Sequence, residues 1–175
     1  MSILKVARMG NPCLQKISER VSDDWWKTAD ARQFIPDLIE TMREYNGVGL
    51  AAPQVHRPIR VAVVEIGSNP RYPSVPPHPL TVLINPGILS DPCESNQDWE
   101  GCLSVPEIRG RVPRPSRVRI KAMDESGIVR EISAEGFFAR AIQHEIDHLD
   151  GKVFLERADP STLAYTEEFV RYHAS

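Results

Sequence analysis

Apolar positions between residues 30 and 45 recur at intervals of three and four residues. They are Phe34, Ile35, Leu38, Ile39 and Met42. This spacing predicts an amphipathic helix with one face in the core. Pro36 lies inside the pattern, where a proline removes a hydrogen bond and clashes with the preceding turn. We therefore expect the regular helix either to begin near Pro36 or to be kinked there.

Short runs of β-branched and other apolar residues predict strands in the middle of the chain, at 61–66 and 81–84. Charged and apolar residues alternate over 117–121, which predicts a half-exposed strand. The sequence Asp-Glu-Ser-Gly then favours a turn before 128–132, so these two segments are expected to form a hairpin. Five prolines fall between 67 and 80, and we expect this segment to be an irregular loop.

The last third of the chain predicts two helices. One runs from about Phe137 to Leu149 and ends before Gly151, a residue suited to a left-handed C-cap. The other, at about 159–173, begins at Asp-Pro, a favourable pair for the N-cap and first helical position. Strands in the middle and helices near both ends predict a single α+β domain over 1–175. The 137–149 helix is expected to be surrounded by antiparallel or mixed β-structure.

Composition and charge exclude several classes of protein. A formal net charge of -3 lacks the basic excess of a dedicated nucleic-acid binder, so we expect no DNA partner. We expect no membrane association, because no apolar run is long enough to cross a bilayer. The N-terminus lacks the apolar region of a signal peptide, and three cysteines at irregular spacing suit a reducing compartment. A cytoplasmic location is expected.

The sharpest chemical pattern is His144-Glu145-Ile146-Asp147-His148. Residues four apart lie on one face of a helix, so two imidazoles at this spacing can share a metal ion. Glu145 would lie beside that ion, where its carboxylate can handle the proton of a bound water. His56, His78 and His173 lie outside the pattern, and we expect them in loops or the tail, exposed to solvent.

A catalytic metal site needs a third protein ligand and one position left for water. Glu168 is one candidate, as in proteases that use a downstream glutamate. A cysteine is the other, and the sequence around Cys102 favours it. If Cys93 also bound the ion, two cysteines and two histidines would form a closed structural zinc site, which would not need Glu145.

Three segments together resemble the motifs of the peptide deformylase family. They are 47–54 (Gly-Val-Gly-Leu-Ala-Ala-Pro-Gln), 100–104 (Glu-Gly-Cys-Leu-Ser) and 143–151 (Gln-His-Glu-Ile-Asp-His-Leu-Asp-Gly). They occur in the family's order at comparable intervals, and the resemblance extends from about Leu4 to about Leu155. It implies an α+β fold and hydrolytic removal of the formyl group from the N-terminal formyl-methionine of new polypeptides.

The resemblance also implies roles for individual residues. The metal ligands would be Cys102, His144 and His148. Glu145 would be the acid and base, while the side-chain amide of Gln54 and the backbone N–H of Leu103 would stabilise the developing oxyanion. Substrate-binding positions would include Gly47, Gly49, Gly101 and, near the peptide exit, Arg109. The native ion would be ferrous iron, although this donor set also suits zinc, nickel or cobalt. The partners would be formyl-Met nascent peptides, with transient proximity to the ribosome.

Selectivity for methionine would require an apolar slot, for which we expect Val48, Phe137 and Ala141 as lining. Phe137 and Ala141 share a helical face with His144. Arg140 stands where many bacterial members carry an apolar residue, so the shape of this slot is open. Basic residues between 109 and 121 could contact RNA or an acidic peptide, but the alternation over 117–121 favours a solvated strand face.

Overall fold

The helix near the N-terminus, α1, runs from Ala29 to Glu44 and contains Pro36. It therefore begins before the proline, and a start near Pro36 is wrong. The Thr28 hydroxyl accepts a hydrogen bond from Ala31 N, which satisfies one of the free amides of the first turn. The predicted stripe faces the core, where Phe34, Ile35, Leu38 and Met42 are buried. The computed structural model describes residues 2–67, 75–89 and 94–173.

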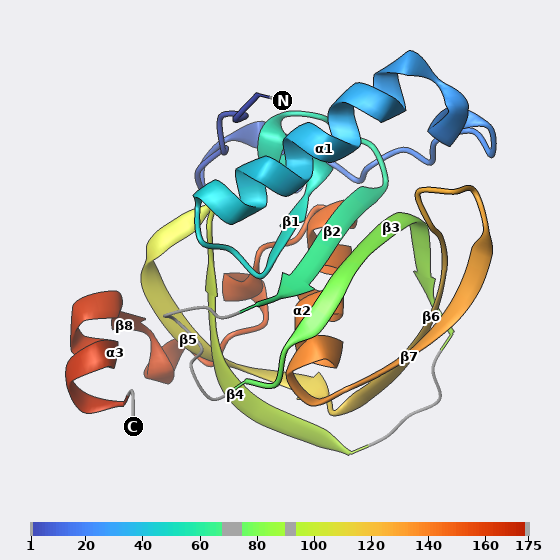
Figure 1. Cartoon of the computed structure of the whole chain (residues 1–175). Helices are drawn as coiled ribbons and strands as arrows, with labels where there is room; N and C mark the ends of the chain where they lie inside the picture. The colour runs from blue at the N-terminus through green and yellow to red at the C-terminus, as the bar shows by residue number, and fades with distance from the viewer. Residues whose placement is uncertain (1, 68–74, 90–93, 174–175) are drawn as a thin grey trace.

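The larger sheet lies between α1 and a second helix, α2 (Figure 1). Its strands have the order β1-β2-β3-β6-β7 and pair antiparallel throughout. Their bounds are β1 Gly49–Ala51, β2 Val61–Ile66, β3 His78–Ile88, β6 Arg117–Met123 and β7 Val129–Glu135. The hairpin predicted from the 117–132 sequence is confirmed as β6 and β7.

Strand β2 shows why this sheet needs a helix on each face. Val61 and Val63 pack in the cluster that contains the apolar face of α1. Ala62, Val64 and Ile66 point the other way, into the cluster that contains α2. A strand covered on both faces has consecutive apolar residues instead of an alternating pattern, as in the run Val61–Val64 before the partly buried Glu65.

Strand β3 is longer than the sequence predicts, because it begins at His78 and includes Pro79. The irregular loop predicted for 67–80 is therefore wrong at its C-terminal end, while 68–74 lie outside the described residues. The pairing of β3 with β2 shifts register between Val64 and Ile66, opposite Pro79. Proline is tolerated at such a bulge because the residue there does not need an N–H for the ladder of hydrogen bonds. His78 lies in this strand, not in a loop, and its ring stacks on Phe138 at 3.4 Å.

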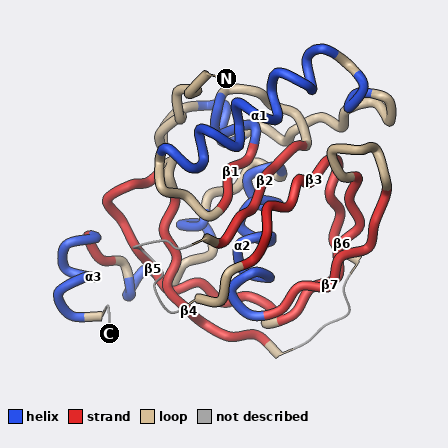
Figure 2. The backbone as a smooth tube through the Cα atoms, viewed as in Figure 1, coloured by secondary structure: helices blue, strands red, loops and turns tan. Residues whose placement is uncertain are grey.

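A second, three-stranded sheet has the order β4-β5-β8, with β4 at Ser95–Cys102, β5 at Val105–Pro115 and β8 at Ala164–Tyr165 (Figure 2). The sequence analysis identified none of these strands. The first half of β4 is polar and exposed, and β5 contains prolines, so neither segment carries a strong strand pattern.

Helix α2, Gly136–Leu149, confirms the helix predicted at 137–149. Every residue from Phe138 to Leu149 is buried, because sheet lies on more than one side of the helix. Gly151 follows with φ +74°, the left-handed conformation expected of a residue after the helix end. A Cβ at this position would lie 2.8 Å from the carbonyl oxygen of Gln15, so glycine is required for space as well.

The C-terminal segment differs from the single helix expected at 159–173. Asp159 accepts a hydrogen bond from Ser161 N, but it caps only a 3-10 turn, Pro160–Thr162. Strand β8 then pairs with β5, and α3 begins at Thr166 and ends at Tyr172. Pairing with the free edge of β5 outweighs the local helical preference of this segment. In the described part of the chain, no helix is long and apolar enough to span a membrane.

Candidate active site

Cys102, His144 and His148 converge although they come from two elements far apart in sequence. Cys102 ends β4, and the two histidines lie one turn apart on α2. Their ligand atoms all lie within 4.8 Å of one another, and Cys102 Sγ is 3.2 Å from His148 Nε2. All three side chains are buried. One thiolate and two imidazoles form a suitable donor set for a divalent ion with an open fourth position.

The two other candidate ligands are not part of this group. Glu168 lies in α3 with an exposed side chain 3.6 Å from Arg171. It is not among the ligand atoms that the described residues bring together around the histidines. Cys93 lies outside the described residues.

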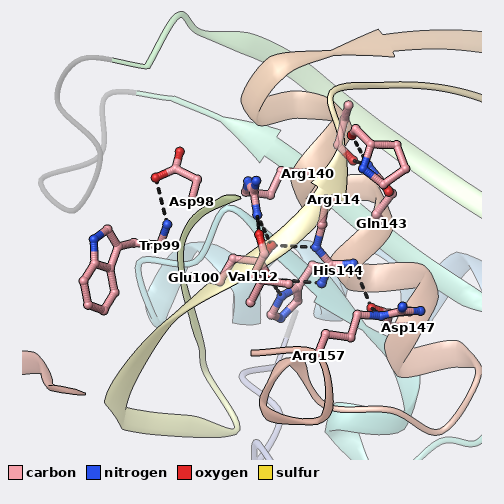
Figure 3. Close-up of polar contacts among 12 residues, drawn as sticks. Asp98, Trp99, Glu100, Val112, Arg114, Arg140, Gln143, His144, Asp147 and Arg157 are labelled. Carbon is pink, nitrogen blue, oxygen red and sulfur yellow. Dashed lines mark hydrogen bonds and ion pairs between the residues drawn. The ribbon is translucent and has the colours of Figure 1, made fainter. Parts of the chain in front are cut away.

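Glu100 fixes the orientation of His144. Its carboxylate accepts a hydrogen bond from His144 Nδ1 at 2.9 Å (Figure 3). Nε2 of His144 is thereby left to face the thiol of Cys102. Arg114 and Arg140 hold the same carboxylate at 2.6 and 2.7 Å. Contacts of this kind fix the tautomer of a metal-binding histidine and raise its basicity. The sequence analysis gave Glu100 no role, because its partners are distant in sequence.

The protonation of this cluster follows from burial and its charged neighbours. Burial raises the pKa of the Cys102 thiol, but His148 and His144 outweigh it and hold that pKa well below the usual range. Burial lowers the pKa of His144, but Cys102 and Glu100 outweigh it and raise the pKa well above its usual value. The cluster therefore favours a thiolate with a positive charge beside it, and a divalent cation would satisfy the same demand.

Glu145 is buried next to this cluster, and Gly49 of β1 makes room for it. Burial is the main cause that raises the pKa of its carboxyl to about 7. A Cβ at Gly49 would collide with Glu145 Oε1 and lie 2.8 Å from its Cδ. Glu145 Oε2 has no hydrogen-bond partner among the described residues. A carboxyl group in this environment can exchange a proton near neutral pH.

Gln54 presents its amide group to the same site. Its Oε1 accepts a hydrogen bond from Ala51 N at 2.8 Å, which fixes the orientation of the amide. The opposite end, Nε2, lies 3.5 Å from Cys102 Sγ and 3.2 Å from Ser104 Oγ. The side chain is 1% exposed, so this N–H donor is held in place in a buried site.

One pocket opens onto the cluster and contains most of the predicted substrate-binding residues. Its lining includes Gly47, Val48, Gly49, Gly101, Leu103, Phe137 and Ala141. Asn46 and Trp99 also line it, and the sequence analysis missed both. Arg109 is not part of the lining. It lies opposite Gly101 in the β4–β5 pairing, with its guanidinium packed across that glycine.

Arg140 borders the pocket, but its charge is bonded elsewhere. The guanidinium donates to Glu100 Oε1 at 2.7 Å, to Val112 O at 2.8 Å and to Asn96 Oδ1 at 2.8 Å. The residue is 4% exposed. Arg140 therefore links α2 to β4 and β5. Its aliphatic carbons face the pocket more than its charged group does.

Replacing Arg140 with leucine is expected to lower the free energy of unfolding by about 3 kcal/mol, because Glu100 loses a partner while remaining buried. Urea denaturation measures this loss. Arg119→Leu is the matched control, since exposed Arg119 pairs across β6 and β7 with exposed Glu131 at 3.8 Å. That control is expected to change stability by less than about 0.5 kcal/mol. Equal losses in the two variants would contradict the role given to Arg140.

These features define a class: an α+β protein in which an HExxH helix and a cysteine on a neighbouring strand form a candidate metal centre. The family model described as polypeptide deformylase matches residues 3–164. Peptide deformylase 1 of Prochlorococcus marinus is 44% identical over 172 residues, covering 96% of this chain and 88% of that protein.

Solved structures of similar proteins point to the same family. A class I type b peptide deformylase from Acinetobacter baumannii matches with a TM-score of 0.87 and 42% identity, covering 91% of this chain and 100% of that chain. The same enzyme with Met-Ala-Ser bound gives a TM-score of 0.86 and 42% identity, covering 90% and 99%. The chain belongs to the peptide deformylase family. It is a hydrolase of protein biosynthesis that removes the N-formyl group from new polypeptides, and the family is metal-dependent.

Proposed function

We propose that Cys102, His144 and His148 hold the metal ion of this deformylase. The observation that carries the proposal is the convergence of one buried thiol and two imidazoles within 4.8 Å, beside Glu145 and Gln54. The buried contact from Glu100 to His144 Nδ1 supports it, because metal-binding histidines are held in this way. When bound, the ion supplies a Lewis acid and lowers the pKa of water at its open position.

Glu145 acts as the acid and base. Its carboxylate accepts a proton from the water whose oxygen attacks the formyl carbon. It then delivers that proton to the methionine nitrogen as the carbon–nitrogen bond breaks, and formate leaves. A carboxyl whose pKa is raised to about 7 is suited to both transfers near neutral pH.

Gln54 and Leu103 stabilise the charge that develops on the formyl oxygen. The Gln54 amide is held by Ala51 N with its N–H donors beside Cys102, and Leu103 follows Cys102 and lines the same pocket. Donors fixed in advance are effective because they need no reorganisation during the reaction. Each is worth roughly 2.7–4 kcal/mol of barrier.

The peptide binds along β1 with the methionine side chain in the pocket. β1 pairs with β2 on one side and is the edge of the larger sheet, so an extended peptide can add beside it. Val48, Phe137 and Ala141 provide the apolar lining. The relative that binds Met-Ala-Ser supports a formyl-methionine peptide as the substrate class.

Replacing Gly49 with alanine is expected to lower kcat/KM by about 10²-fold, since displacement of a reacting group by 1 Å has that effect. The new methyl group would force Glu145 out of its position. Formate release measures the loss. Gly87→Ala is the control, because a Cβ there meets nothing within 4 Å. Full activity in Gly49→Ala would show that Glu145 has more freedom than its packing indicates.

We propose ferrous iron as the native ion, with zinc, nickel or cobalt able to take its place. A thiolate ligand and ferrous iron are both open to oxidation. Enzyme purified without oxygen is therefore expected to lose most of its activity on exposure to air. A nickel-substituted sample is expected to lose less, because only the thiolate remains open to oxidation. Metal content is measured on the same samples. Stable full activity of the iron form in air would contradict this assignment.

The enzyme is proposed to act in the cytoplasm, close to the ribosome, because its substrate is the N-terminus of a chain under synthesis. The basic residues of β6 do not add an RNA-binding surface to this proposal. Arg117 and Arg119 pair with Glu135 and Glu131 of β7, which reduces the positive charge of that face.

One experiment tests the proposed function as a whole. The metal-loaded protein is incubated with formyl-Met-Ala-Ser, and formate release and bound metal are measured on the same sample. Formate in proportion to metal content is expected. A sample that holds one equivalent of metal and releases no formate would overturn the proposal.

A further inference from the structure

Strand β4 presents different residues on its two faces. Cys102, a candidate metal ligand, and Glu100, which holds His144, are both buried. Trp99 and Gly101 alternate with them, are half-buried, and both line the pocket. Figure 3 shows the Trp99 ring pointing away from the contact between Glu100 and His144. Trp99 therefore forms the outer rim of the pocket, not its catalytic floor.

Helix α3 holds this tryptophan in place. Phe169 on α3 and His173, the C-cap residue that follows the helix, each place a ring centroid 5.0 Å from that of Trp99. On β5, Arg111 lies directly opposite Trp99, with its guanidinium carbon 5.6 Å from the ring. In Figure 1 the helix lies beside β4 and β5, at the C-terminal end of the chain. The indole is therefore fixed by a segment that contributes no residue to the pocket.

Next to Trp99, the space beside Gly101 is covered by the side chain of Arg109, which does not itself line the pocket. Gly101 has no side chain, and a Cβ there would lie 2.8 Å from Arg109 Cδ. The Arg109 guanidinium carbon lies 5.7 Å from the centre of the Phe169 ring, so α3 also packs against this residue. Trp99 is consequently the large apolar side chain that the β4 rim offers to a peptide leaving the pocket.

We propose that α3 clamps Trp99 at the mouth of the pocket and that Trp99 selects apolar, above all aromatic, side chains at the residue after formyl-methionine. This inference rests on the proposed function, because it requires the methionine to occupy the pocket. An indole fixed by contacts with two rings is preorganised for binding, and aromatic pairs bind through both burial and ring geometry. Trp99 is a specificity-determining residue, and Phe169 is a positioning residue.

The test is a series of peptides, formyl-Met-X-Ser, with glycine, alanine, leucine or phenylalanine at X. The unchanged enzyme is expected to show a kcat/KM for phenylalanine about tenfold above that for glycine, with the difference in KM. In Trp99→Ala this ratio is expected to fall to about twofold or less. An unchanged ratio in Trp99→Ala would overturn the inference.

Variants on α3 separate positioning from simple destabilisation. Phe169→Ala is expected to raise KM for the phenylalanine peptide without lowering kcat, and Phe169→Tyr is expected to restore the ratio. Val170→Ala, next in the helix and 60% exposed, is the matched control and leaves the ratio unchanged. If kcat of Phe169→Ala falls equally for all four peptides, α3 has only a structural role. That result would overturn the proposal that α3 positions Trp99.

A binding measurement gives a readout that does not depend on turnover. Titration calorimetry with unformylated Met-Phe-Ser and Met-Gly-Ser is expected to give the same tenfold preference, lost in Trp99→Ala. If Phe169→Ala fails to fold, the comparison of the unchanged enzyme with Trp99→Ala in this binding measurement still tests the inference. Formate release with no dependence on X overturns the inference alone. Absence of formate from every peptide in the metal-loaded enzyme overturns the proposed function and this inference together.

Discussion

Replacing Glu145 with glutamine is expected to lower kcat by at least about 10³-fold, within the range for loss of general acid–base catalysis. The amide has nearly the same shape, so the pocket and the three candidate ligands keep their geometry. It cannot accept the proton of the attacking water, and the methionine nitrogen then departs without a proton. Formate release measures the loss, and metal analysis of the same sample is expected to show full occupancy.

Glu107→Gln is the control for this experiment, because Glu107 is an exposed glutamate on β5. It is expected to retain the unchanged kcat. The result also distinguishes the deformylase from a purely structural zinc site, in which Glu145 would have no chemical role. Retention of activity in Glu145→Gln would show that another group handles the proton.

Replacing Cys102 with alanine is expected to remove the metal and to lower activity by more than about 10³-fold, because water without a metal keeps a pKa near 15.7 instead of about 7. His144 and His148 then remain as two ligands, too few for a stable three-ligand centre. Metal content after dialysis, together with formate release, measures both effects.

Three control variants discriminate among the ligand sets. Cys13→Ala changes a cysteine outside the cluster and is expected to retain metal and activity. Glu168→Ala is also expected to retain both, whereas a protease-like site would lose its ion. Cys93→Ser would lose metal only if a closed site with two cysteines formed. Metal retention by Cys102→Ala, with loss in either Glu168→Ala or Cys93→Ser, would refute the proposed ligands.

Some secondary-structure elements were predicted wrongly or missed, and they show where a local sequence pattern is not sufficient. The segment after Asp159 carries a favourable helix start, yet it pairs as β8 with the edge of β5 before α3 begins. Strands β4 and β5 were missed because their polar and proline-containing sequences gain stability from pairing with each other. Both outcomes depend on partners that a short sequence window does not contain.

The sequence by itself determined the elements and chemistry that depend on near neighbours. The period of 3.6 residues defines α1 and α2, and it places His144 and His148 on one face with Glu145 beside them. The short apolar, β-branched run at 61–66 predicts strand β2. These features follow from spacing within one or two turns, so they can be predicted without the fold.

Only the tertiary structure decided which distant groups meet. It brings Cys102 to within 3.2 Å of His148 Nε2 and places Glu100 against His144 Nδ1 at 2.9 Å. It also turns the charge of Arg140 away from the pocket and sets Trp99 against α3. Such contacts depend on how sheets and helices pack around a shared core, and burial then fixes the charge and orientation of each group.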